Sequence, residues 1–367
     1  MYRRVAGVGL ALTMLVAGCG HSSSTSQGPA TSSTPVPSVA TSSTRAASAT
    51  SQAARDLPDP HTLRGLTEVP ELPDPKPVEG SSAQKLPVTV TDVEGNKVTI
   101  KSTSRILALD LYGTLSRTLI GLGLGDKIVG RTVSSTEKQL HDRPVVTENG
   151  HVLNVEAVAG LKPSVIIADR SVGPKEALDQ LRKSGIPVVL VDPHRSVDST
   201  PQLIRTIADA VGKPDAGEAL VKRTQEQIDQ AKKQIAAWKP AKPMRVAFLY
   251  VRGNAGVFFI LGSENGASEL IQGAGADDVA SDKGITTLVP ANAESLVSIN
   301  PDAIFVMRDG LASTGGMKGL LARAGVANTT AGRKQRVISI PDGISLSFGP
   351  QTGEVLTAVA KALYGVK

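Results

Sequence analysis

The chain of 367 residues has little cysteine and few aromatic residues: a single Cys, and 3% Phe, Trp and Tyr together. The lone cysteine, Cys19, cannot form a disulfide bond within the chain. Aromatic side chains are too sparse for the base-stacking surface of a protein that binds single-stranded nucleic acid. The net charge of +6 comes from interspersed acidic and basic residues rather than from a basic stripe. We therefore expect no nucleic-acid partner.

Sequence signatures of catalysis are also absent. The glycine-bearing segments 113–116 and 121–125 lack a Walker or dinucleotide-binding fingerprint. No clustered Cys/His pattern predicts a zinc site, and no nucleophile-elbow motif is present. These absences favour a binding protein over an enzyme.

The first residues predict secretion. Arg3 and Arg4 precede a short, mostly apolar run at 5–16, and small residues then lead to Cys19. This pattern is typical of a signal peptide over residues 1–18 and is too short to span a membrane. The ending Val-Ala-Gly-Cys resembles the lipobox of bacterial lipoproteins, and the alternative is an ordinary signal peptide with an incidental cysteine. We expect lipidation at Cys19 and anchoring on the extracytoplasmic face of the cell membrane.

Residues 19–84 are rich in Ser, Thr, Pro and Ala and contain few large apolar side chains. A segment of this composition cannot bury enough apolar surface to offset the entropy lost on ordering. We predict a disordered tether, which would let the folded part stand away from the lipid bilayer.

The remaining residues, 85–367, are enough for two lobes. Val88, Val90, Val98 and Ile100 alternate with polar residues on either side of a turn. This period of two predicts a β-hairpin.

Beyond the hairpin, short apolar runs alternate with helical stretches. The predicted buried strands are 106–109, 165–168 and 188–191, followed by 246–249, 303–306 and 337–340. The predicted helices are 114–122, 155–161, 175–184, 200–211, 269–273 and 353–364. This alternation is typical of an α/β fold with parallel strands and covering helices.

One long amphipathic segment separates the two series of strands. Its mostly apolar face repeats every three or four residues, at Val221, Thr224, Ile228, Ala231, Ile235 and Trp238. Prolines begin and end the pattern. We predict a helix, 214–240, that connects an N-terminal α/β lobe, 85–213, to a C-terminal α/β lobe, 241–367. The alternative is an ordinary surface helix within one domain.

An internal repeat supports two lobes. Asn154 begins Asn-Val-Glu followed by an apolar helical stripe and a proline, and Asn292 begins Asn-Ala-Glu with the same continuation. The asparagine of each copy can cap a helix, and Glu156 or Glu294 suits the positive end of the helix dipole. Capping alone explains each glutamate, but their matched placement suggests a second use.

Lipobox, tether, two α/β lobes, one connecting helix and the paired Asn-x-Glu elements together resemble class III substrate-binding proteins. These proteins serve ABC importers of haem, ferric siderophores and cobalamin. The resemblance implies that ligand binds between the lobes and that a glutamate of each lobe contacts arginines of the permease. Glu156 and Glu294 are the matching positions.

Within that family, segments 147–154 and 249–253 resemble the actinobacterial haemin-binding lipoproteins. The resemblance implies that a histidine and a tyrosine bind haem iron from opposite faces, with an arginine supporting the tyrosine. The matching residues are His151, Tyr250 and Arg252. It also allows an upstream haem receptor as a further partner.

These residue types suit ferric haem. His and Tyr are both axial ligands of haem iron, and Arg252 can donate a charge-assisted hydrogen bond to a Tyr250 phenolate. Residues i and i+2 of a strand share a face, so the two side chains are expected to be neighbours. Tyr112 and His194, which follow predicted strands, are alternative contacts with the ligand.

Three other functions stay open at this point. The same fold could bind a ferric siderophore or cobalamin. It could serve as an extracytoplasmic enzyme, or it could act without a permease as a passive haem relay or a surface adhesion protein.

Overall fold

A computed structural model of the chain describes residues 57–79, 84–253 and 256–367, which all belong to one compact unit. The predicted signal peptide, Cys19 and most of the predicted tether lie outside the described residues. Within the described ranges, no helix combines the length and apolar character needed to cross a membrane.

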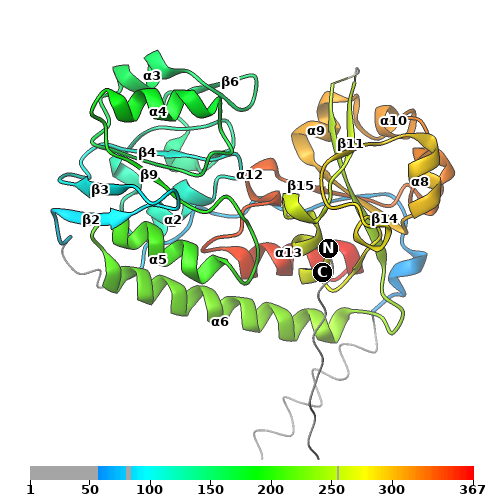
Figure 1. The fold of residues 1–367 in the computed structure, drawn as a ribbon. Coiled ribbons are helices and arrows are strands. Elements are labelled where there is room, and N and C mark those ends of the chain that lie inside the picture. Colours follow the sequence, from blue (N-terminus) through cyan, green and yellow to red (C-terminus); the bar gives the residue numbers. More distant parts are fainter. Residues whose placement is uncertain (1–56, 80–83, 254–255) are drawn as a thin grey trace, which may run out of the picture. The chain divides into compact units, whose positions relative to one another are not determined.

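The first half of the described chain contains a parallel sheet in the order β5-β4-β8-β9. Figure 1 labels β4 and β9 of this sheet. Its strands are β4 (Ile106–Leu109), β5 (Ile128–Gly130), β8 (Val165–Ala168) and β9 (Val188–Leu190). Its principal helices are α2 (Thr114–Gly121), α3 (Val155–Gly160), α4 (Lys175–Lys183) and α5 (Thr200–Ala210). Every residue of β4 and β8 is buried, because apolar clusters cover both faces of the sheet. The predicted parallel sheet is confirmed, as is the hairpin of β2 (Val88–Thr91) and β3 (Lys97–Ile100).

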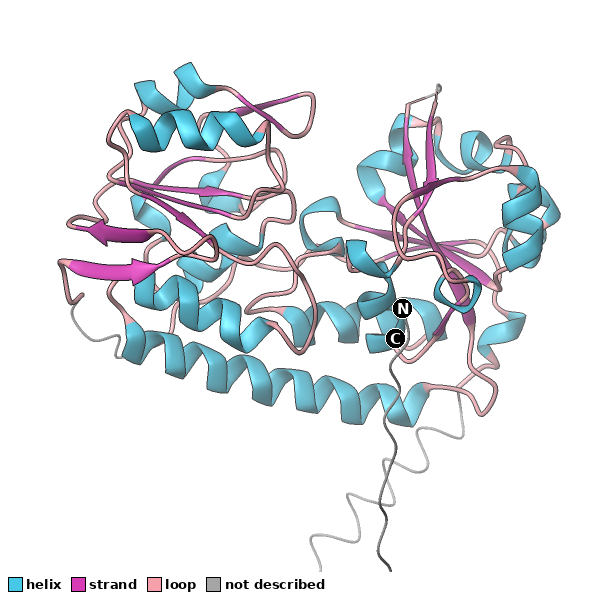
Figure 2. Cartoon of the chain, in the orientation of Figure 1, coloured by secondary structure: helices cyan, strands magenta, loops and turns pink. Residues whose placement is uncertain are grey.

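The second half contains a mixed sheet in the order β1-β15-β14-β10-β11-β13, with β12 (Asp277–Asp278) also paired to β10. Its strands are the magenta arrows on the right of Figure 2, with cyan helices around them. The long strand β10 (Arg245–Arg252) runs parallel to β14 (Ala303–Met307), which runs parallel to β15 (Val337–Ile340). The antiparallel strands are β11 (Val257–Ile260) and β13 (Val289–Pro290). Its helices are α7 (Ala267–Gly273), α8 (Ala293–Ile299), α9 (Arg308–Ser313), α10 (Gly316–Leu321), α11 (Thr330–Lys334), α12 (Asp342–Ser345) and α13 (Thr352–Tyr364).

The long helix α6 (Pro214–Trp238) lies between the two series of strands in the sequence. Its buried face includes Leu220, Val221, Thr224, Ile228, Ala231 and Ile235, as the periodicity predicts. The helix packs against α5 of the first half and α13 of the second (Figure 1). One continuous element therefore contacts helices of both halves.

The prediction of a disordered tether over 19–84 is wrong for residues 57–79. Strand β1 (Leu66–Glu68) forms one edge of the sheet by pairing in parallel with β15, and Val69 is fully buried. The amide of Val78 donates to the carbonyl oxygen of Gly121 at 2.9 Å. The prediction failed because it used the average composition of residues 19–84. That average does not reveal the few apolar residues of 57–79 that complete the edge of a sheet.

A buried polar joint links α2 to the second half of the chain. Arg117, which is 4% exposed, donates from Nη1 to Oε1 of Gln351 at 2.7 Å and from Nε to the carbonyl oxygen of Gly343 at 3.3 Å. The buried carboxylate of Glu137 lies 3.5 Å from the same guanidinium. Burying these groups is costly unless they stay paired, so the joint favours one arrangement of the elements that it connects.

Candidate functional site

Tyr250 and Arg252 lie side by side at the end of β10. Both are half-buried, whereas Val251 between them is buried, which is the alternation expected of a strand. The guanidinium carbon of Arg252 lies 5.3 Å from the centroid of the Tyr250 ring. The prediction that the two side chains are neighbours is confirmed, and their contact is within the range of a cation–π interaction.

Arg252 is also paired with an acid that the sequence did not predict. Its Nη2 atom donates to Oδ1 of Asp342, at the start of α12, at 2.5 Å. Burial of Arg252 acts to lower its pKa, but the Asp342 carboxylate and Tyr250 raise the pKa above its usual value. The arginine therefore stays charged beside the tyrosine.

His151 lies in the turn between β6 (Thr147–Glu148) and β7 (Val152–Leu153). Asn149 and Gly150 turn the chain with φ of 48° and 88°, a region that suits Asn and Gly. The carbonyl oxygen of His151 accepts from the Gly173 amide at 2.8 Å, which ties the hairpin to the following segment. Its exposed imidazole makes no hydrogen bond or ion pair within the described ranges, and none joins it to Tyr250 or Arg252.

Tyr112 lies in a different electrostatic setting. It is half-buried beneath Arg195, whose guanidinium carbon is 5.4 Å from the ring centroid. Tyr112 and Tyr250 both pack against the core cluster of the second half of the chain. Burial, followed by the negative charge of Asp169, raises the pKa of Tyr112. Its phenol is therefore harder to ionise than a tyrosine in water.

A buried charge cluster lies at the carboxyl edge of the parallel sheet. Asp110 follows β4 and Asp169 follows β8, and both are fully buried. Arg195 forms an ion pair with Asp169 and lies 3.8 Å from Asp110. Burial, reinforced by repulsion from Asp169, raises the pKa of Asp110 to about 7. One oxygen of Asp110 has no hydrogen-bond partner among the described residues.

We expect Asp110 to make the stability of the protein depend on pH. Because its pKa is raised on folding, the folded state holds this proton more tightly, and ionisation between about pH 4 and 7 costs stability. The wild-type midpoint of thermal unfolding should fall as pH rises through 7, and the fall should be smaller in Asp110→Asn. Calorimetry between pH 5 and 8 measures both, and equal falls in the two proteins would contradict the assignment.

The second alternative contact, His194, is exposed on the segment after β9. Its amide donates to Oδ1 of Asp192 at 2.8 Å, which shapes the local turn. No hydrogen bond or ion pair of its imidazole is present in the described part of the chain.

The two predicted docking residues occupy equivalent positions. Glu156 and Glu294 are exposed in the first turns of α3 and α8. The capping asparagines accept from the amides of Ala157 and Ser295, each at 2.8 Å. The asparagines therefore cap both helices, and neither glutamate carboxylate has a partner in the described residues.

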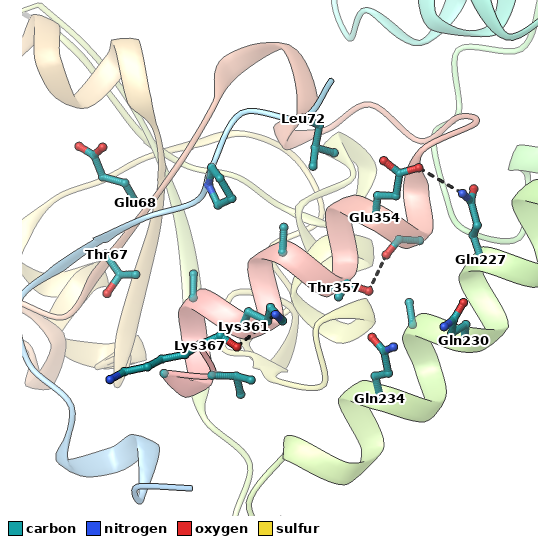
Figure 3. A pocket seen from close by; sticks show the side chains of 17 residues that line it. Thr67, Glu68, Leu72, Gln227, Gln230, Gln234, Glu354, Thr357, Lys361 and Lys367 are labelled. Carbon is teal, nitrogen blue, oxygen red and sulfur yellow. Dashed lines mark hydrogen bonds between the residues drawn. The ribbon is translucent and has the colours of Figure 1, made fainter. Parts of the chain in front are cut away.

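A groove among the described residues lies away from these candidate residues (Figure 3). It has a volume of about 770 Å³ and lies between α6, α13 and the segment that contains β1. Gln227 and Glu354 face each other across it through a 3.1 Å hydrogen bond. None of its lining residues is a predicted ligand of iron, and no group of three or more His, Cys, Asp or Glu in the described residues could hold a metal ion.

Sequence reasoning missed Asp110, Asp169 and Asp342. The first two directly follow predicted strands, where the carboxyl ends of parallel strands gather functional groups, so that rule could have found them. No local sequence pattern predicts that Asp342 contacts Arg252, because only the register of β10, β14 and β15 brings the two residues together.

Comparison with known proteins gives concordant results. A family model described as periplasmic binding protein matches residues 111–343. The solved structure of the heme binding protein HmuT superposes with a TM-score of 0.83 and 49% identity, covering 84% of this chain and 100% of that one. Solved variants of that protein carry alanine in place of a histidine, a tyrosine or an arginine.

Curated relatives are more distant. The ABC transporter substrate-binding lipoprotein YvrC of Bacillus subtilis is 27% identical over 280 residues, which is 76% of this chain and 86% of YvrC. A cobalamin-binding protein of Halobacterium salinarum is 25% identical over 299 residues, which is 80% of this chain and 78% of that protein. The family consists of substrate-binding proteins, in agreement with the expectation of a binding protein rather than an enzyme. The chain belongs to the periplasmic binding protein family and has its class III α/β fold.

Proposed function

We propose that this chain is an extracytoplasmic, lipid-anchored haem-binding protein that delivers ferric haem to an ABC importer. The observation that carries the proposal is the Tyr250–Arg252 pair, in which a guanidinium lies 5.3 Å from the centroid of a half-buried tyrosine ring. A guanidinium beside the ring can donate a charge-assisted hydrogen bond to an iron-bound Tyr250 oxygen.

The spacing of the predicted ligands supports this proposal. In HmuT, the replaced tyrosine and arginine are two positions apart, as Tyr250 and Arg252 are here. The replaced histidine precedes that tyrosine by the same number of positions as His151 precedes Tyr250. We therefore assign His151 and Tyr250 as the axial ligands of the iron, one on each face, and Arg252 as the support of Tyr250.

The electrostatic setting of Tyr112 disfavours it as the phenolate ligand. Burial and Asp169 raise the pKa of Tyr112, although the guanidinium of Arg195 beside its ring opposes the rise. A ligand role for Tyr112 would require its phenol to ionise next to a buried carboxylate. On the opposite face of the haem, the imidazole of His151 has no competing partner in the described residues. Tyr112 and His194 are proposed only as contacts with the bound ligand.

Two further parts of the proposal concern partners. The exposed Glu156 and Glu294 would pair with cationic residues of the permease. Lipidation of Cys19 would keep the protein at the membrane, and the relative YvrC is named a lipoprotein. An upstream haem receptor is a further expected partner.

The proposal is tested by titrating the full-length chain, with Cys19→Ser to remove its only thiol, with ferric haem. We expect a saturable one-to-one spectral change with a phenolate-to-iron charge-transfer band. The absence of saturable binding would exclude haem as the ligand.

Cobalamin is the second candidate ligand, because curated relatives at 25% and 26% identity are named as cobalamin- or vitamin B12-binding proteins. Cobalamin brings its own ring and lower ligand, so Tyr250→Ala should leave its affinity nearly unchanged. Parallel titrations with haem and cobalamin decide between the two candidates.

A further inference from the structure

The side chain of Arg252 is surrounded by three other segments: the end of β14, helix α9 and helix α12. Besides its bond to Asp342, its Nη2 atom lies 3.5 Å from the sulfur of Met307 at the end of β14. A Cβ atom added at Gly310 of α9 would lie 3.0 Å from Nη1 of Arg252 and 2.5 Å from the carbonyl oxygen of Val251. The carbonyl oxygen of Val251 leaves no room for a Cβ atom here, so glycine lets α9 pack closely beside Arg252.

Asp342 is held in place in turn. Its Oδ2 atom accepts from the backbone amide of Asp309 at 2.8 Å, while Oδ1 accepts from Arg252. The side chain of Asp342 is 16% exposed and that of Arg252 is 33% exposed, so water only partly screens the pair. A charge-assisted bond in this setting holds the direction of the arginine better than a bond at the open surface.

The residue after Asp342 belongs to the buried polar joint. The carbonyl oxygen of Gly343 accepts from Arg117 of α2 at 3.3 Å. A Cβ atom at Gly343 would lie 1.9 Å from Oγ1 of Thr136, so α12 packs directly against the first half of the chain. The same short helix therefore contacts α2 on one side and Arg252 on the other.

We propose that Asp342 is a positioning residue for haem capture, which holds the Arg252 guanidinium over Tyr250 while Arg117 ties α12 to the first half of the chain. The inference rests on the proposed role of Tyr250 as an iron ligand. An arginine has five N–H donors, so the bond to Asp342 leaves donors free for the phenolate oxygen. Without Asp342, the long side chain would have to be ordered at the moment of binding.

A double-mutant cycle tests this role in the full-length Cys19→Ser chain. The cycle compares the parent, Asp342→Ala, Arg252→Ala and the double variant by their haem dissociation constants and their phenolate-to-iron charge-transfer bands. We expect Asp342→Ala to weaken binding about 10-fold or more, as loss of an outer partner of a metal ligand does. The double variant should bind no more weakly than Arg252→Ala, because Asp342 acts only through Arg252.

Two further variants separate positioning from a general loss of structure. Asp342→Asn keeps an oxygen that accepts from the guanidinium, and we expect it to restore the band and most of the affinity. Asp282→Ala removes another exposed carboxylate of the second half, one with no hydrogen bond or ion pair in the described residues, and it should bind haem as the parent does.

Parent-like binding by Asp342→Ala would overturn the inference, and so would additive losses in the double variant. In either case the parent would still show the charge-transfer band, and the proposed function would stand. Absence of the band from the parent itself would overturn the proposed ligand role of Tyr250 and this inference with it.

Discussion

Tyr250→Phe is expected to abolish the phenolate-to-iron charge-transfer band and to weaken ferric haem binding by more than about 100-fold. Removing a direct iron ligand should cost more than the roughly 10–100-fold typical of an outer partner. Phenylalanine keeps the ring that packs against the core cluster and lies under Arg252, so the fold should be preserved. Absorption spectra and equilibrium titrations measure the two effects.

Tyr112→Phe is the matched control for this substitution. Tyr112 is also half-buried, packs against the same core cluster and lies under an arginine. It should retain the band and bind haem within about threefold of the parent. Loss of the band in Tyr112→Phe, with the band intact in Tyr250→Phe, would move the ligand assignment to Tyr112.

Reversing the charge of both Glu156 and Glu294 to lysine is expected to abolish haem uptake while leaving haem binding unchanged. Both side chains are exposed and make no bond in the described residues, so the substitutions remove no internal contact. Two lysines facing permease cations would repel the partner, and juxtaposed like charges suppress association. Uptake in cells and haem titration of the purified variant measure the two properties separately.

The control for docking reverses two other acids in first helical turns, Glu176 of α4 and Asp215 of α6. These substitutions cost the same favourable interaction with a helix dipole and change the net charge equally. The substitution at Asp215 also removes its exposed ion pair with Lys85, which contributes little stability at the surface. Uptake should continue in this control. Normal haem uptake by the variant of Glu156 and Glu294 would contradict the docking role. Each carboxylate would then only stabilise its own helix through the helix dipole.

Much of the fold could be predicted because its buried strands correspond to short apolar runs in the sequence. Runs such as 106–109 and 165–168 are buried on both faces, and no polar residue interrupts them. Helix α6 was predictable for a related reason, since a helix of this length needs one continuous apolar stripe to pack against both α5 and α13. Residues 57–79 were missed because their burial depends on the edge of a sheet built from the end of the chain.

The candidate site was predictable only where it is local in the sequence. Tyr250 and Arg252 are two residues apart on one strand, so their contact follows from strand geometry. The partner of Arg252 comes from α12, which no local pattern connects to β10. The assignment of His151 came from resemblance, because an exposed histidine in a turn has no periodic or capping signal of its own.

The most direct test of haem capture by His151 and Tyr250 is a crystal structure of the ferric haem complex with anomalous diffraction measured at the iron edge. We predict one iron atom bound by a ring nitrogen of His151 on one face and by the phenolate oxygen of Tyr250 on the other, with Arg252 donating to that oxygen. Iron bound through Tyr112 or His194, or haem seated in the groove between α6 and α13, would contradict it.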